Sequence, residues 1–93
     1  MTQTVERISR GGGSSLGDAW KVIVLNDNHN TFEGVAAALS RILPSVSYDQ
    51  GMRMADSIHS TGRAIVWSGH RERAELYWQG LRESGLTMAP LEQ

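Results

Sequence analysis

The first hydrophobic run of the chain is WKVIVLN, which covers residues 20–26 and is rich in β-branched residues. Such a run is typical of a buried β-strand, because branched side chains pack well on a pleated surface. Five polar residues follow, from Asn26 to Asn30, and three of them are asparagine. Asparagine and aspartate side chains can bond the neighbouring backbone, so this segment predicts a tight polar turn.

A helix is predicted directly after the polar turn. Asn30 is placed to cap it, with Glu33 three residues later in a capping-box-like spacing. Apolar residues then recur at helical spacing from Phe32 to Leu43 and form one stripe. Pro44 disfavours helical geometry in the residue before it, so the helix should end there.

A second helix should begin at Ser47, since Gln50 follows at the capping-box distance. Gly62 supplies its C-terminal stop. One face of this helix is expected to carry Met52, Ala55, Ile58 and His59.

The remaining pattern predicts a strand, a helix and a final strand. RAIVWS, residues 63–68, forms the second strand, and a third helix runs from His70 to about Ser84, with Ala74, Tyr77, Trp78 and Leu81 turned inward. Residues 86–92 form the last strand, which Pro90 restricts to an edge. The order β-α-α-β-α-β predicts an α+β fold, a two-layer sandwich whose three-stranded antiparallel sheet carries the helices on one face.

Chain length and composition limit the organisation to one domain. With 93 residues, two domains would each lie near the lower limit for independent folding. Residues 1–19 contain three consecutive glycines and few apolar side chains, which predicts a flexible N-terminal arm. Residues 20–93 are then the folded domain.

Charge and residue usage exclude several classes of protein. The net charge is −1, which argues against nucleic-acid binding, because such domains are usually basic. There is no cysteine, so disulfides and thiolate chemistry are excluded. The apolar runs are too short to cross a bilayer and no secretory signal is visible, so we expect a cytoplasmic protein without membrane contact.

The sequence offers no positive argument for catalysis. No metalloprotease, phosphate-loop or nucleophile-elbow motif is present, and we expect neither an enzyme nor a bound cofactor. His29, His59 and Asp27 could form a metal site only if the fold brought them together, which remains one alternative.

Two features stand out instead, the polar turn and His59 near the end of the second helix. Each has an ordinary explanation: the turn connects two elements, and the histidine is a core residue with a satisfied ring. Asparagine oxygens and a neutral imidazole nitrogen are, however, hydrogen-bond acceptors. Acceptors beside an apolar pocket would suit a cationic amine joined to a hydrophobic group.

Two separated segments, KVIVLNDNHNTFEGV and ADSIHSTGRAIV, carry the most specific pattern in the chain. Together they resemble the ClpS family, whose members are adaptors that deliver N-end-rule substrates to Clp proteases. The segment AELYWQGLRESGL is most similar to cyanobacterial members. The resemblance covers about residues 20–92. It implies the same β-α-α-β-α-β sandwich, which the family shares with the C-terminal domain of the ribosomal stalk protein, and a function that is not enzymatic.

The resemblance also implies roles for individual residues. Asn26 and His59 would hold the α-amino group of a substrate, assisted by Asp27 and Asn28, partly through water. Asn30 and Thr31 would bind the first peptide group. The hydrophobic pocket would be lined by Phe32, Val35, Ala55, Ile58 and one of Leu86 or Thr87.

This chain departs from the family pattern inside the implied pocket. Asn28 stands where the family usually has a second acidic residue, Phe32 replaces a methionine at the pocket mouth, and Ala55 replaces a methionine deeper inside. The smaller Ala55 should add volume, and a rigid aromatic at position 32 should reshape the opening. These differences predict altered strength and specificity for the N-terminal residue.

The partners implied are N-degron substrates and the N-terminal domain of a Clp unfoldase of the ClpC or ClpA type. Docking on the unfoldase would involve Glu72 and Tyr77, the second of which stands where the family has a basic residue. The main alternative is an interaction domain of the ribosomal-stalk type, in which Phe32 fills the cleft and no N-terminal residue is recognised. A variant adaptor with altered specificity is a further alternative.

Overall fold

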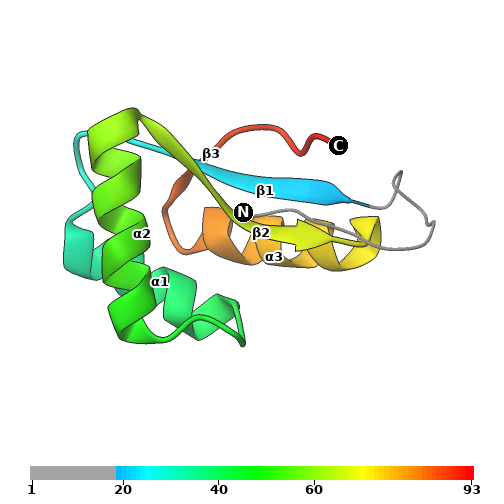
Figure 1. Ribbon diagram of the computed structural model, residues 1–93, viewed down its shortest axis with the longest axis horizontal. Helices are drawn as coiled ribbons and strands as arrows, with labels where there is room; N and C mark the ends of the chain where they lie inside the picture. Colours follow the sequence, from blue (N-terminus) through cyan, green and yellow to red (C-terminus); the bar gives the residue numbers. More distant parts are fainter. Residues whose placement is uncertain (1–18) are drawn as a thin grey trace.

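The computed structural model describes residues 19–93, and the predicted arm over residues 1–19 lies almost entirely outside this range. The elements are β1 (Trp20–Leu25), α1 (Phe32–Ile42), α2 (Tyr48–Thr61), β2 (Arg63–Gly69), α3 (Arg71–Glu83) and β3 (Thr87–Met88) (Figure 1). The predicted element order and the α+β class are therefore confirmed. No helix within residues 19–93 is long and apolar enough to cross a lipid bilayer.

The sheet has the strand order β2-β1-β3, and both neighbours run antiparallel to β1. Three consecutive residues of β1, Val22, Ile23 and Val24, are buried, as expected for the central strand. The register with β2 shifts between Val22 and Ile23, so one extra residue lies on β2 opposite this point.

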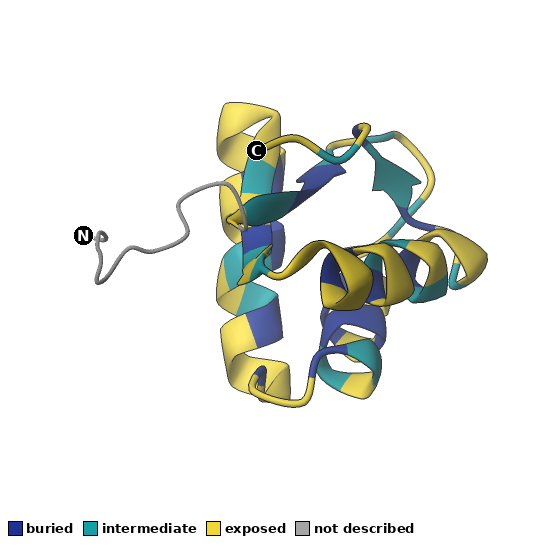
Figure 2. Ribbon diagram, turned by 90° about the vertical axis from the view of Figure 1, so that its right-hand side faces the viewer, coloured by how far each residue is buried: buried dark blue, intermediate teal, exposed yellow. Residues whose placement is uncertain are grey.

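The core lies where the apolar stripes of the helices meet the sheet. In Figure 2 the buried positions of the helices face inward and their outer faces are exposed. Figure 1 shows α2 running across the direction of β1 and α3, with α1 beside it. The largest fully buried side chains are Ile23, Leu39, Leu43, Leu81, Val22 and Val24.

The local signals at α2 behave as predicted. The Ser47 hydroxyl accepts a hydrogen bond from the Gln50 backbone N–H, and the Gln50 side chain accepts one from the Ser47 backbone N–H. This reciprocal pair satisfies two backbone donors at the helix start. Gly62 closes the helix with φ of 94°, a left-handed conformation that glycine adopts without a steric cost.

The prediction for the start of α1 is wrong by one residue. The N-cap is Thr31, whose hydroxyl accepts a hydrogen bond from the Gly34 backbone N–H. Asn30 lies one residue before this cap, and its side-chain amide donates instead to Asp27 and to the carbonyl of Gly85.

The last strand is shorter than predicted. Only Thr87–Met88 pair with β1, and one isolated bridge joins Lys21 to Glu92. Pro90 has no backbone N–H to donate, and the indole N–H of Trp78 donates to the carbonyl of Ala89 at 2.7 Å. The ladder is therefore interrupted between its two points of pairing.

Candidate functional site

The polar turn after β1 is organised around the carboxylate of Asp27. One oxygen, Oδ1, accepts hydrogen bonds from the backbone N–H groups of His29 and Asn30, at 3.1 and 2.8 Å. The other oxygen, Oδ2, accepts from the Asn30 side-chain amide at 2.7 Å and from the Thr87 hydroxyl at 2.8 Å. A carboxylate offers about four acceptor positions, so these four donors occupy it and fix the shape of the turn.

The same contacts determine the ionisation of Asp27. Burial alone would raise the pKa of this carboxyl, since its side chain is only 11% exposed. The hydrogen bonds donated by Asn30, Thr87 and His29 outweigh burial and hold the pKa of Asp27 well below its usual range. The turn therefore carries a negative charge at neutral pH.

Asn30 ties the turn to a distant part of the chain. Its amide nitrogen donates to Asp27 and also to the carbonyl of Gly85, at 2.9 Å, in the connection between α3 and β3. Both amide N–H groups are thus used, which leaves the Asn30 side-chain oxygen as an acceptor without a partner in residues 19–93.

A backbone contact brings the C-terminal end of α2 beside this turn. The N–H of Asn26 donates to the carbonyl of Gly62 at 2.9 Å, immediately after the last turn of α2. His59 lies in that last turn and is exposed, so the alternative of a core histidine is wrong. Within the described residues, the His59 ring and the side chains of Asn26 and Asn28 have no hydrogen-bond partner.

A pocket of about 310 Å³ lies between the polar turn and the helices. Its interior is apolar, because Val35, Ala55, Ile58 and Leu86 are buried residues that line it. The sequence-predicted residues found in its lining are Asn26, Asp27, Asn28, Asn30, Phe32, Val35, Ala55, Ile58, His59, Leu86 and Thr87.

Thr31, which was predicted to bind the first peptide group, is not part of the lining, and its hydroxyl caps α1. Val24 and Leu25, at the end of β1, line it although they were not singled out. Their position directly before the polar turn is the sequence signal that could have identified them, since a strand end and the turn that follows share one edge of the sheet.

Phe32 forms part of the wall and leaves the pocket open. Its ring contacts the His59 ring edge-on, with centroids 5.3 Å apart and an interplanar angle of 61°. A cleft filled by Phe32 was the feature that would have favoured the stalk-type alternative, and this geometry does not provide it.

The alternative metal site finds no support in the described residues. His29 Nε2 lies 3.8 Å from Asp27 Oδ2, but within residues 19–93 no three His, Cys, Asp or Glu side chains gather as a metal would require.

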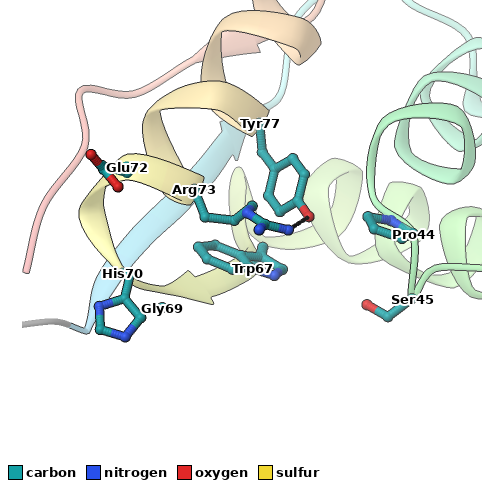
Figure 3. A pocket seen from close by; sticks show the side chains of 8 residues that line it. All are labelled: Pro44, Ser45, Trp67, Gly69, His70, Glu72, Arg73 and Tyr77. Carbon is teal, nitrogen blue, oxygen red and sulfur yellow. Dashed lines mark hydrogen bonds between the residues drawn. The ribbon is translucent and has the colours of Figure 1, made fainter.

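The predicted docking residues lie elsewhere. Glu72 and Tyr77 line a separate, larger hollow beside α3, drawn in Figure 3. Tyr77 is only 7% exposed, whereas Glu72 is exposed.

The fold and the site define a small α+β binding domain, in which unpaired polar acceptors surround the mouth of an apolar pocket. The family model for the ATP-dependent Clp protease adaptor protein ClpS matches residues 16–92. The chain belongs to the ClpS family, and it is an adaptor of a Clp protease rather than an enzyme.

Curated relatives from cyanobacteria are similar over most of their length. The chain is 51% identical over 73 residues to the ATP-dependent Clp protease adapter protein ClpS of Thermosynechococcus vestitus, covering 78% of each chain. It is 52% identical over 73 residues to that of Nostoc sp., covering 78% of this chain and 75% of the relative. Among solved structures, Agrobacterium tumefaciens ClpS2 bound to L-phenylalaninamide matches with a TM-score of 0.70 and 28% identity, covering 81% of this chain and 98% of that chain.

Proposed function

We propose that this adaptor binds the free α-amino group and the bulky hydrophobic side chain of the N-terminal residue of degradation substrates, and delivers them to a Clp unfoldase. The observation that carries the proposal is the pairing, in one pocket, of unpaired acceptors from the polar turn and from α2 with an apolar interior. The Agrobacterium ClpS2 supports it, because phenylalaninamide carries an amine and a benzyl group on the same carbon.

The amine end of the pocket suits an ammonium group. An ammonium has three donors, and the side-chain oxygen of Asn26 together with a neutral His59 ring supplies acceptors for two of them. The carboxylate of Asp27 adds a negative charge, and the C-terminal end of α2 presents the negative end of a helix dipole. Asn28 completes this rim as a neutral acceptor.

Asn30 is suited to the first peptide group of the substrate. With both of its amide N–H groups bound to Asp27 and Gly85, its oxygen is the atom left to accept a hydrogen bond from a peptide N–H. The Thr31 hydroxyl accepts from Gly34 and retains its own hydrogen as a donor, so it can contribute from outside the pocket.

The apolar end of the pocket selects the side chain of the substrate's N-terminal residue. A pocket of about 310 Å³ accommodates Leu, Phe, Tyr or Trp, and Ala55 leaves depth at its interior. Phe32 narrows the mouth with a flat ring that cannot bend aside as an unbranched side chain can.

A titration with labelled peptides that differ only in the N-terminal residue tests this proposal. We expect binding for peptides beginning with Leu, Phe, Tyr or Trp, and loss of binding when the amine is acetylated. His59→Ala should weaken binding, whereas His29→Ala, an exposed histidine outside the pocket lining, should not. Equal binding of the acetylated and free peptides would refute amine recognition.

Delivery is the second half of the proposal. The face that carries Glu72 and Tyr77 would dock on the N-terminal domain of a ClpC- or ClpA-type unfoldase, and residues 1–19 would act as a tether into the unfoldase. A chain lacking residues 1–18 should bind peptides normally and fail to promote their degradation. Undiminished degradation would exclude the tether role.

A further inference from the structure

A second hollow, larger than the substrate pocket, lies apart from it. It has a volume of about 680 Å³ and lies between the connection after α1, the end of β2 and the first turns of α3 (Figure 3). Its lining shares no residue with the substrate pocket. The lining residues are Pro44, Ser45, Trp67, Gly69, His70, Glu72, Arg73 and Tyr77.

The aromatic floor of this hollow is held in place by packing. The rings of Trp67 and Tyr77 meet edge-on, with centroids 5.0 Å apart and an interplanar angle of 82°. The Trp67 ring lies so close to Gly69 that a β-carbon at that position would come within 2.6 Å of it. Gly69 therefore allows the indole to lie against the strand.

Arg73 covers this floor and presents its charge to solvent. Its guanidinium carbon lies 5.9 Å from the centroid of the Tyr77 ring, and its Nη1 atom donates to the Tyr77 hydroxyl at 3.3 Å. Since the Tyr77 side chain is nearly buried, a partner approaching this position meets the guanidinium of Arg73 rather than the tyrosine.

The guanidinium has donors to spare. An arginine carries five N–H donors, and only the contact to Tyr77 uses one here. Among residues 19–93, no carboxylate forms an ion pair with Arg73, whereas Arg71 is paired with Glu75 and Arg63 with Glu92. The neighbouring Glu72 directs its carboxylate away from Arg73 (Figure 3).

We propose that Arg73 is the cation through which this adaptor docks, and that it binds an aspartate or glutamate side chain of the unfoldase N-terminal domain. The inference rests on the delivery half of the proposed function, and it identifies the residue and the chemical group that it takes. A planar guanidinium with free donors matches a carboxylate with two parallel hydrogen bonds. Because Tyr77 already holds the Arg73 side chain in place, little side-chain freedom is lost when a partner binds.

The test is calorimetric titration of the full chain with the isolated N-terminal domain of its Clp unfoldase. Arg73→Ala should weaken binding about tenfold. Arg73→Lys should weaken it less, because lysine keeps the positive charge although it lacks the two parallel N–H donors of the guanidinium. Arg82→Ala is the matched control, because Arg82 also lies on α3 over an aromatic ring, 5.6 Å from the Trp78 centroid, but does not line the hollow. It should bind as the unmodified chain does.

A second measurement separates this inference from the proposed function. Peptides with a free N-terminal Phe should bind all three variants equally, which shows that the domain is folded. Unaltered docking by Arg73→Ala, or an equal loss in Arg82→Ala, would overturn the role of Arg73 and leave the proposed function standing. Failure of the unmodified chain to bind the unfoldase domain would overturn delivery, and this inference with it.

Discussion

At the scale of single residues, the side chains of the polar turn have different roles, depending on whether they already have hydrogen-bond partners within the protein. The Asp27 carboxylate accepts four hydrogen bonds from the protein, whereas the side chains of Asn26, Asn28 and His59 form none within residues 19–93. Asp27 therefore organises the turn, and the other three are free to meet a ligand.

Asp27 should make stability depend on acid pH. Its pKa is lower in the folded chain than the ordinary value near 3.9 that applies when the chain is unfolded. The ionised carboxylate therefore stabilises the fold fully above about pH 4, and this contribution is lost as the pH falls below it. Urea unfolding should show Asp27→Asn less stable by about 2 kcal/mol at pH 7. The difference between the two proteins should shrink below about pH 4, and a constant difference down to pH 2.5 would contradict this account.

His59 should make substrate binding depend on pH, with weaker binding at acid pH. An imidazole can accept a hydrogen bond only when it is neutral, so protonation would remove this acceptor. Affinity for a peptide with a free N-terminal Phe, measured by fluorescence anisotropy, should therefore fall as the pH is lowered from 8 to 5.5. The pH dependence should disappear in His59→Ala and persist in His29→Ala. An unchanged affinity over this range in the unmodified chain would remove His59 from the role.

Asn28 should limit affinity. A hydrogen bond to a charged group contributes about 1.5–3 kcal/mol and a neutral one about 1 kcal/mol, so Asn28→Asp should strengthen peptide binding by up to about tenfold. The gain should shrink as NaCl is added, because salt screens an exposed charge pair. Weaker binding by Asn28→Asp would show that position 28 does not face the amine.

Local signals in the sequence indicated the polar turn, which follows a strand, and His59 near the end of a helix. The apolar lining of the pocket was predicted only from the resemblance to ClpS. The contact from Asn30 to Gly85 spans 55 positions, and no local pattern reveals it. For this reason Asn30 was mistaken for a helix cap, which Thr31 provides instead.

At the scale of the elements, the sequence predicts the two ends of α2 correctly, but it predicts a longer β3 than the structure has. The capping box at Ser47 and the left-handed Gly62 are properties of adjacent residues, so the sequence predicts them. The extent of β3 depends on Trp78 of α3, whose indole N–H donates to the carbonyl of Ala89. A pattern of apolar residues does not indicate which donor that carbonyl accepts.

The packing of α1 on α2 depends on Gly51. A β-carbon at this position would lie 2.9 Å from the α-carbon and the carbonyl oxygen of Ala36, both backbone atoms that cannot move aside. Helix propensity alone would make Gly51→Ala stabilising by about 1 kcal/mol, but the clash should reverse the sign and destabilise by about 1–3 kcal/mol. Thermal unfolding measures this difference.

Gly80→Ala, in α3, is the matched control for that substitution. Its β-carbon would lie 3.2 Å from the side chain of Ile42, which can shift its terminal atoms. Its free energy of unfolding should remain within about 1 kcal/mol of the unmodified chain. A Gly51→Ala variant more stable than the unmodified chain would disprove the close approach of the helices.

At the scale of the whole molecule, the two hollows are built from different residues. Sites that share no residue and no bonded network usually act additively. The dissociation constant for an N-terminal Phe peptide should therefore change less than about twofold when the unfoldase N-terminal domain is added at saturation. A larger change, measured in the same titration, would reveal coupling between cargo binding and docking.

The hydrogen bonds from Thr87 and Asn30 to Asp27, and from Asn30 to Gly85, join the two ends of the folded chain at the amine end of the pocket. Under the proposed function, substrate binding would therefore depend on Gly85 and Thr87 as well as on the polar turn. A chain cut before Gly85 would lose both contacts and should bind its substrate less well.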